Sequence, residues 1–442
     1  MRNVGKVGAV AAMAVAVFLL AGLGIFRGVR TENAIPAPGA PDPAAFTGPA
    51  AGSLDAAIRS LQERLRAEPT DWRGLASLGL AYVQQARVTA DPSYYPKAEG
   101  ALQQSLDLNV EDNDQAAVGM SALAAARHDF AVALDWGERA KAINPYSAAV
   151  YGVIGDAQLE LGRYGAAFTT FQQMVDLRPD LSSLSRVSYA RELMGDVPGA
   201  IEAMEQAKRY ASDPADRAWA SYQLGELSFN RGDLSSAAAA YREGTRLDPA
   251  YVPNFAGLAK VGWARGDLDG AIRGYAGVVA RYPSPEYVIA LGDLYRAAGH
   301  GALAAEQDGL LDAEESLLEA SGVNVDLEQA LFDAGHGDPR GGLAAARAEW
   351  DRRHSVQVAD ALAWALHESG RDEEAVRYAN LAMRLGTRSA LFAFHAGMIQ
   401  RSLGHLDSAR TLLAEAAEIN PYFSIQYAPA LERALAGLGG GS

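Results

Sequence analysis

A repeat of 34 residues constrains the fold of this chain more than any other feature. Between residues 218 and 283, two consecutive units carry the same residue types in the same order: Leu followed by Gly or Ala, then a small residue, an aromatic residue and a final proline. Ala237 and Ala271 are 34 residues apart, and so are Pro249 and Pro283. Because one such unit cannot bury its apolar face alone, it needs a neighbouring unit on each side.

Each unit predicts two helices joined by the tripeptide Gly-Asp-Leu, which occurs at 232–234 and again at 266–268. Glycine allows the first helix to end in a left-handed conformation, and the aspartate side chain can cap the next helix. The alanines Ala237 and Ala271 allow two helical backbones to approach closely.

The spacing and the residue types resemble the tetratricopeptide repeat. Prolines fall 34 or 35 residues apart along the array, at Pro145, Pro179, Pro214, Pro249 and Pro283. From Pro69 to Pro421 there is room for ten periods, with eight of the spare residues in a long turn at 89–96. The resemblance implies an all-α fold, an α-solenoid of about ten helical hairpins, in which repeats two, four and eight match least well.

The same pattern sets the predicted domain boundaries. Residues 1–30 form a transmembrane anchor or an uncleaved signal-like segment, and residues 31–52 form a linker rich in Pro, Ala and Gly. The repeat solenoid covers 53–438, beginning with a half unit at 53–69 and ending with a capping helix at 422–438. Residues 439–442 are a flexible tail.

The N-terminal segment predicts a single-pass membrane protein. Twenty uncharged residues lie between Lys6 and Arg27, which is the length that crosses a bilayer core. Arg27 and Arg30 stand where a cleavable signal peptide would have its cleavage site, so we expect the segment to be retained; cleavage would give a secreted protein. The charged residues on either side of the segment hardly indicate its orientation in the membrane. However, the short N-terminal tail before a large domain favours a repeat domain on the extracytoplasmic side.

Composition excludes several functions. The net charge of -15 argues against nucleic-acid binding, which needs a basic surface, and the absence of cysteine excludes disulfides and thiolate chemistry. No histidine pair has zinc-hydrolase spacing, and no Gly-rich loop follows a strand. We therefore expect no enzyme activity, no cofactor and no metal site.

Five of the seven histidines lie after residue 330, so the alternative hypothesis is an exported small-molecule or metal-handling module that uses the C-terminal repeats.

The resemblance also implies where a partner would bind. In the resembled family, the first helix of each repeat lines a concave groove that receives a peptide or a partner helix. The groove candidates here are Asp156, Glu160, Tyr189, Glu192, Trp219, Tyr222, Glu226, Phe229, Lys260, Trp263, Asp293 and Arg296. For any one aromatic ring among them, packing in the core between helices is the competing interpretation.

The groove candidates predict the character of the partner. Acidic residues dominate them, and the two-Lys, two-Asn carboxylate clamp of chaperone-binding members has no match. A basic or mixed-charge segment therefore suits the groove better than an acidic C-terminus. The sequence predicts a membrane-tethered scaffold that binds a protein or peptide partner.

Overall fold

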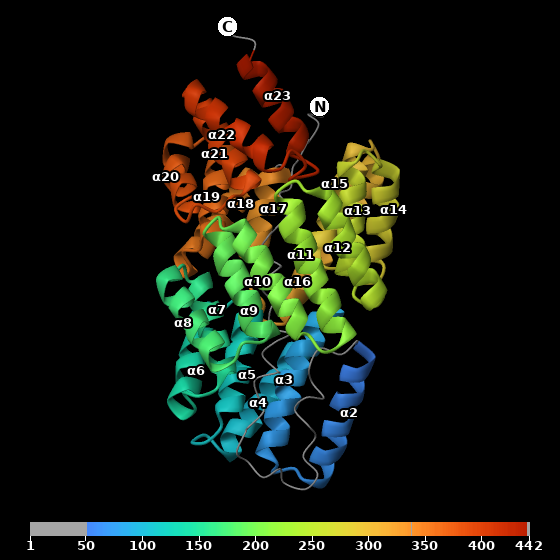
Figure 1. Cartoon of the computed structure of the whole chain (residues 1–442), viewed down its shortest axis with the longest axis vertical. Coiled ribbons are helices and arrows are strands. Elements are labelled where there is room, and N and C mark those ends of the chain that lie inside the picture. Colours follow the sequence, from blue (N-terminus) through green and yellow to red (C-terminus); the bar gives the residue numbers. More distant parts are fainter. Residues whose placement is uncertain (1–50, 337, 440–442) are drawn as a thin grey trace.

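The computed structural model describes residues 51–336 and 338–439, and within them the chain forms 22 helices and no strand (Figure 1). This count exceeds the twenty helices of ten hairpins because single helices flank the array, α2 (Ala51–Ala67) before it and α23 (Ala428–Gly439) after it. The predicted anchor at 1–30, the linker up to residue 50 and the last three residues of the tail lie outside the described residues. Among the described helices, none is both long and apolar enough to cross a membrane.

Between the flanking helices, consecutive helices pack as antiparallel pairs. The first five pairs are α3 (Trp72–Thr89) with α4 (Tyr94–Leu108), α5 (Asp114–Ala126) with α6 (Phe130–Ile143), α7 (Ala148–Glu160) with α8 (Tyr164–Leu177), α9 (Leu181–Leu193) with α10 (Val197–Tyr210), and α11 (Pro214–Asn230) with α12 (Leu234–Leu247). The next five are α13 (Pro253–Ala264) with α14 (Leu268–Val279), α15 (Pro285–Ala297) with α16 (Gly301–Ala320), α17 (Asp326–His336) with α18 (Pro339–Arg352), α19 (Val356–Glu368) with α20 (Asp372–Ala382), and α21 (Ala390–Ser402) with α22 (Leu406–Ile419).

The turns inside the hairpins form as the Gly-Asp-Leu tripeptides predict. Gly232 has a φ of +78° and Gly266 a φ of +90°, a region that L side chains rarely adopt. Asp233 then accepts a hydrogen bond from the amide of Ser236 at 3.0 Å, and Asp267 accepts one from Gly270 at 2.8 Å. Each helix end thus gains partners for backbone groups that the helix itself leaves unpaired.

The spacing that the units share has a packing reason at Tyr241. Its ring is fully buried and lies against the first helix of its own repeat and of the next one. A Cβ atom at Gly225 would lie 2.2 Å from this ring, and one at Gly257 would lie 2.5 Å from it. Glycine after Leu224 therefore leaves the space that the aromatic ring of the second helix fills.

The array of repeats forms a superhelix in which repeats almost six units apart are in contact. Hydrogen bonds join residues that are 191 to 196 positions apart, a little under six repeats. They are Arg127 to Ser321, His128 to Asn324, Tyr282 to Arg87, Arg353 to Glu160, Val356 to Tyr164, Thr387 to Leu193, and Asn420 to Phe229. Two superhelical turns therefore stack directly on each other, with α17–α23 above α7–α12 (Figure 1).

Candidate functional site

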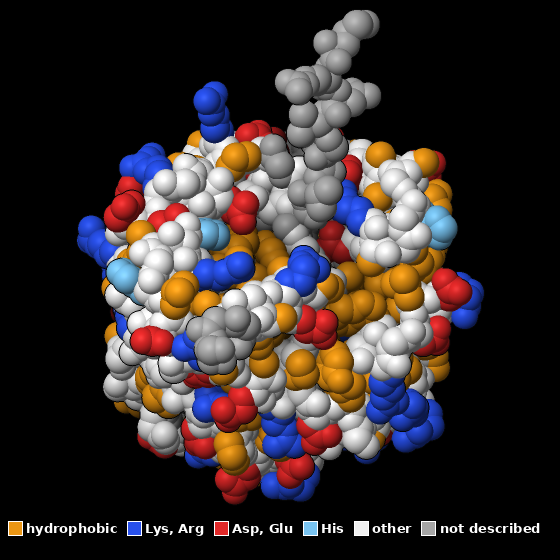
Figure 2. All heavy atoms as spheres, turned by 90° about the horizontal axis from the view of Figure 1, so that it is seen from above, with side chains coloured by type: hydrophobic (Ala, Val, Ile, Leu, Met, Phe, Trp, Pro, Cys, Tyr) orange, Lys and Arg blue, Asp and Glu red, His pale blue; other side chains and the backbone are white. Residues whose placement is uncertain are grey.

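A cavity of about 190 Å³ lies between the two turns. One wall comes from the first helices of four consecutive repeats: α9, α11, α13 and α15. The opposite wall comes from α19 and from two segments of the C-terminal turn, residues 387–392 and 420–425. Seen from the C-terminal end of the stack, hydrophobic side chains gather near the middle, next to a few charged side chains, and charged side chains of both signs surround them (Figure 2). We call this space the inter-turn cavity.

Apart from Glu160 and Glu192, the sequence predicts ten groove candidates, and the structure places six of these ten on this cavity. They are Tyr189, Glu226, Phe229, Lys260, Trp263 and Asp293. Of the two further acidic candidates, Glu192 lines the cavity, whereas Glu160 lies outside it in a contact between the turns. The first helices of the repeats therefore contribute most of one wall.

The structure corrects the groove assignment of two aromatic candidates. Trp219 is only 2% exposed and packs in a core cluster with Leu181 and Leu184 of the preceding repeat. Tyr222 is 3% exposed, and its ring contacts those of Tyr241 and Tyr251 at centroid distances of 6.0 and 6.1 Å. The adjoining repeats cover both rings, so the competing interpretation as core residues holds for them.

Two charged candidates also lie outside the cavity lining. Asp156 accepts two hydrogen bonds from Arg186 of the next repeat, at 2.8 and 2.6 Å. Arg296 forms ion pairs with Asp293, at 3.3 Å, and with Asp308 of the following helix. Both side chains therefore connect neighbouring helices of the array.

Equivalent positions of successive repeats form a row of charges along one wall. Glu192, Glu226 and Lys260 follow one another at intervals of 34 residues. The Nζ atom of Lys260 donates to both carboxylate oxygens of Glu226, at 2.8 and 2.7 Å, and lies 4.4 Å from the ring centroid of Phe229. The Tyr241 hydroxyl also donates to Glu226, at 2.5 Å. Glu226 and Lys260 thus neutralise each other within the cavity wall.

Two other carboxylates of the cavity lack such a partner. Burial raises the pKa of Glu192 to about 7, although Asn230 donates a long hydrogen bond of 3.4 Å to it. Burial likewise raises the pKa of Glu286 to about 7, and the nearby charge of Glu226 adds to the effect. Among the residues that the structure describes, no cation pairs with either carboxylate. Both are held where ionisation is disfavoured.

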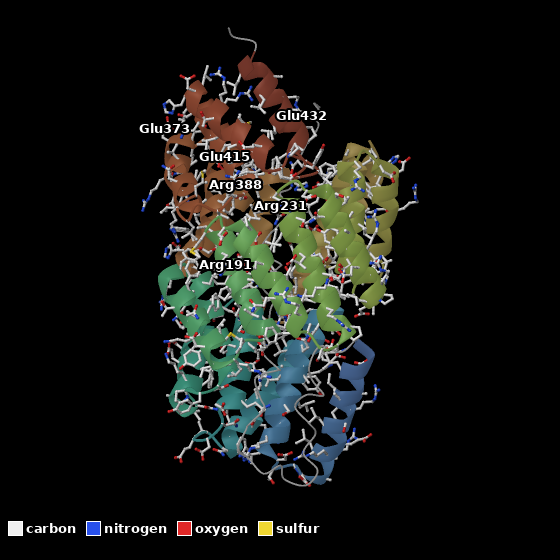
Figure 3. All side chains as sticks on the ribbon, viewed as in Figure 1. Arg191, Arg231, Glu373, Arg388, Glu415 and Glu432 are labelled. Carbon is white, nitrogen blue, oxygen red and sulfur yellow. The ribbon has the colours of Figure 1, made fainter. Side chains whose placement is uncertain are left out.

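The opposite wall contains residues that the sequence did not single out. Gln357 of α19 donates from Nε2 to the Tyr189 hydroxyl at 2.7 Å, and Asn420 donates from Nδ2 to the Phe229 carbonyl at 2.8 Å. Arg388 lies where the two turns meet (Figure 3), next to Gly195. These residues occupy the cavity only because the solenoid coils back on itself, and nothing in the repeat pattern distinguishes them.

Three of the five histidines after residue 330 each pair with one aspartate. The pairs are His336 with Asp293, His367 with Asp372, and His395 with Asp360. His395 is fully buried in α21, and its ring stacks on Trp364 at 4.1 Å. Within the described residues, no three His, Asp or Glu side chains come together in a way that could hold a metal ion. These contacts fit hydrogen-bonded pairs and ring packing.

Comparisons with known proteins agree with the repeat assignment. Residues 148–181 and 190–252 match two family models described as tetratricopeptide repeat. No curated protein matches the sequence significantly. Among solved structures, a tetratricopeptide repeat protein from Parabacteroides merdae is 15% identical, covering 59% of this chain and 98% of its own, with a TM-score of 0.34.

Two other solved structures are similar over shorter stretches. MamA is 20% identical, over 37% of this chain and 95% of its own, with a TM-score of 0.29. YrrB, described as a tetratricopeptide repeat protein with an unusual peptide-binding site, is 16% identical, over 42% of this chain and 93% of its own, with a TM-score of 0.29. The two matched family models place tetratricopeptide repeats at residues 148–181 and 190–252, and the 34-residue units and helical hairpins continue the same pattern along the described part of the chain.

Proposed function

We propose that this chain is a non-enzymatic scaffold that binds a peptide segment of a partner protein in the inter-turn cavity. Tetratricopeptide repeats mediate interactions between proteins. The observation that carries the proposal is the cavity itself: four consecutive first helices line one wall, which is the surface that the repeat resemblance assigns to partner binding. A volume of about 190 Å³ holds on the order of a dozen waters, enough room for one or two side chains of an extended segment.

The lining residues suit recognition of a peptide. Aromatic rings give a large contact area at a small loss of conformational entropy, and they dominate the energetics of many interfaces. Phe229 and Trp263 stand on neighbouring repeats at equivalent positions, 34 residues apart, but the Phe229 side chain is only 3% exposed. Trp263 is only half-buried, so its ring has surface left for a ligand.

The proposal includes a membrane tether. The uncharged residues 7–26 would anchor the chain, and the Pro-rich residues 31–50 would separate the repeats from the bilayer surface. We propose that the repeats lie on the extracytoplasmic side. Sequencing the N-terminus of the mature protein tests the anchor: retention of residues 1–30 agrees with it, and a new terminus near Ala37 or Ala40 contradicts it.

A peptide selection tests the binding function. The full chain, immobilised, is offered a phage library of random nonapeptides, and the recovered peptides are measured against Trp263→Ala and Tyr146→Ala. Tyr146 is 84% exposed and far in sequence from the cavity lining, so it is the matched aromatic control. We expect binding to weaken about thirtyfold with Trp263→Ala, the loss of a hot-spot ring, and to stay unchanged with the control. A selection without specific peptides, or equal binding by both variants, contradicts the proposal.

A further inference from the structure

We infer that the inter-turn cavity selects a basic peptide segment, whose Lys or Arg side chains pair with Glu192 and with Glu286. The inference rests on the proposed function and names the chemical class of its ligand. Five carboxylates line the cavity, those of Glu192, Glu226, Glu286, Asp293 and Asp360, against the cations Lys260 and Arg388. The cavity is therefore short of positive charge.

The two cations of the cavity form no direct ion pair with Glu192 or Glu286, although the charge of Lys260 acts on Glu286 from a distance. Lys260 donates to both oxygens of Glu226, as described above. The Arg388 side chain is 47% exposed and points its guanidinium toward Glu418, with an N–O distance of 3.6 Å. Asp293 and Asp360 have their own partners in Arg296 and in His395. Glu192 and Glu286 are left as the unneutralised acids of the cavity.

Lys260 shows how this cavity holds an alkylammonium group. Its Nζ atom lies against a carboxylate on one side and over the ring of Phe229 on the other. A cation over an aromatic face gains further energy when water is excluded. Tyr189 and Tyr275 supply further rings to the same lining. A ligand ammonium or guanidinium group at Glu192 or at Glu286 would meet the same kind of surroundings.

A buried amide provides a second, independent sign of a ligand. Gln223 lines the cavity, is only 4% exposed, and its Nε2 atom has no hydrogen-bond partner in the described part of the chain. A buried donor without a partner costs free energy, which an acceptor on a ligand would recover. A peptide backbone offers carbonyl oxygens at regular spacing, whereas a simple polyamine offers none. The orphan donor therefore favours a peptide over a small cation.

The ionisation of the two acids gives the binding a pH dependence. Because the pKa of each is raised to about 7, each is about half protonated at neutral pH before the ligand binds. A ligand cation stabilises the ionised form, so binding releases about one proton in total at pH 7. Affinity for a basic peptide therefore rises from pH 6 to pH 8.

The composition of the selected peptides tests the inference. The random nonapeptide selection is repeated with the full chain as wild type, as E192Q/E286Q and as E202Q; Glu202 is 79% exposed and serves as the control for loss of a carboxylate at the surface. We expect Lys and Arg to be enriched at least fivefold in peptides bound by the wild type and by E202Q. The enrichment should disappear with E192Q/E286Q while peptides are still captured. Wild-type affinity should rise severalfold from pH 6 to pH 8.

Two outcomes overturn the inference and separate it from the proposed function. Selection of peptides without basic enrichment, or with enrichment that E192Q/E286Q retains, rejects the basic ligand but leaves peptide binding intact. Spermidine that binds as tightly as the selected peptides, and displaces them, shows a small-cation site and rejects the peptide class. A selection without any specific peptide rejects the proposed function and the inference together.

Discussion

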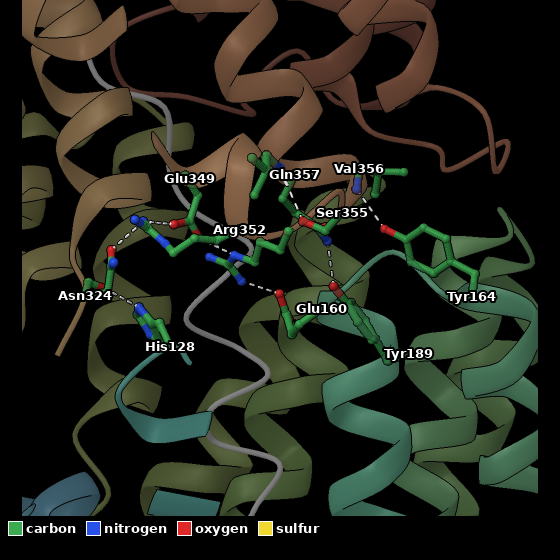
Figure 4. Close-up of polar contacts among 12 residues, drawn as sticks. His128, Glu160, Tyr164, Tyr189, Asn324, Glu349, Arg352, Ser355, Val356 and Gln357 are labelled. Atoms are coloured by element: carbon green, nitrogen blue, oxygen red, sulfur yellow. Dashed lines mark hydrogen bonds and ion pairs between the residues drawn. The ribbon is translucent and has the colours of Figure 1, made fainter. Parts of the chain in front are cut away.

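Arg353, which directly follows α18, forms a buried ion pair with Glu160 of α7, a residue 193 positions earlier in the chain. The Arg353 side chain is 2% exposed and also pairs with Glu349 of α18. Around this pair, His128 contacts the carbonyl of Asn324, and the backbone amide of Val356 donates to the Tyr164 hydroxyl (Figure 4). The two superhelical turns thus meet through polar contacts that are specific in position. The cavity lies between those turns, so its shape depends on them.

Replacing Arg353 should therefore destabilise the stacked arrangement. Arg353→Met leaves the buried Glu160 carboxylate without its cation, whereas Glu349 keeps its ion pair with Arg352, and the loss costs about 3–5 kcal/mol. Arg231→Met is the control, because its ion pair with Asp233 is largely exposed and contributes about 1 kcal/mol or less. Urea unfolding of both variants measures the difference. Equal unfolding midpoints would show that the Arg353 contact does not stabilise the fold.

Substituting two glycines that both have a positive φ distinguishes the cost of backbone strain from the cost of disturbing the contact between the two turns. Gly162 has a φ of +74°, and a Cβ there would lie 2.3 Å from the carbonyl oxygen of His354 in the other turn. Gly266 has a φ of +90°, with nothing within 4 Å of its Cβ position. Gly266→Ala should cost only the left-handed strain, about 1–2 kcal/mol. Gly162→Ala should cost more and should also enlarge the radius of gyration in X-ray scattering. Unchanged scattering with equal destabilisation would contradict direct stacking at this loop.

Two tryptophans should respond differently to truncation. Trp219 is buried among residues of the neighbouring repeat, so Trp219→Ala should cost about 3–5 kcal/mol of folding free energy. Trp263 is half-buried on the cavity wall, and Trp263→Ala should cost about 1–2 kcal/mol. Thermal and urea unfolding compare the two. A larger loss of stability with Trp263→Ala than with Trp219→Ala would mean that Trp263, and not Trp219, packs in the core.

The raised pKa of Glu286 links the stability of the unliganded protein to pH. Its pKa rises from 4.5 to about 7 on folding, so the folded state binds the proton more tightly than the unfolded state does. This contribution to stability is fully present below pH 4.5 and is lost as the pH rises through 7. Glu286→Gln keeps a neutral side chain of the same shape. It should match the wild type near pH 4 and be more stable by about 1–3 kcal/mol at pH 8. A wild-type protein that is the more stable of the two at pH 8 would contradict the burial of this carboxylate.

The repeat period predicts the hairpins because each hairpin is determined locally. Gly232 ends one helix and Asp233 caps the next through contacts within a few residues, so the sequence reveals both. Position within the repeat also places Glu226 and Lys260 on the inner wall. The contact between Glu160 and Arg353 is different. Its separation of 193 residues is no multiple of the period, since it depends on small rotations that accumulate from repeat to repeat.

Because these small rotations cannot be read from the sequence, the residues of the opposite cavity wall could not be predicted either. Gln357 and Asn420 reach the site only after a full superhelical turn. The burial of Trp219 is equally hard to predict. A ring on the first helix of a repeat can pack against the preceding repeat or face the groove, and the angle between the two hairpins decides which. Propensity and spacing do not set that angle.

Hydrogen–deuterium exchange, with and without a selected peptide, tests most directly the central claim that both turns form one peptide site. The account predicts slower exchange on binding in α9, α11 and α13 and, at the same time, in residues 387–392 and 420–425 of the other turn. Helices α2–α4, which contribute nothing to the cavity lining, should exchange at unchanged rates. Protection confined to the outer helices α10, α12 and α14, or absent from residues 387–392 and 420–425, would contradict a site between the turns.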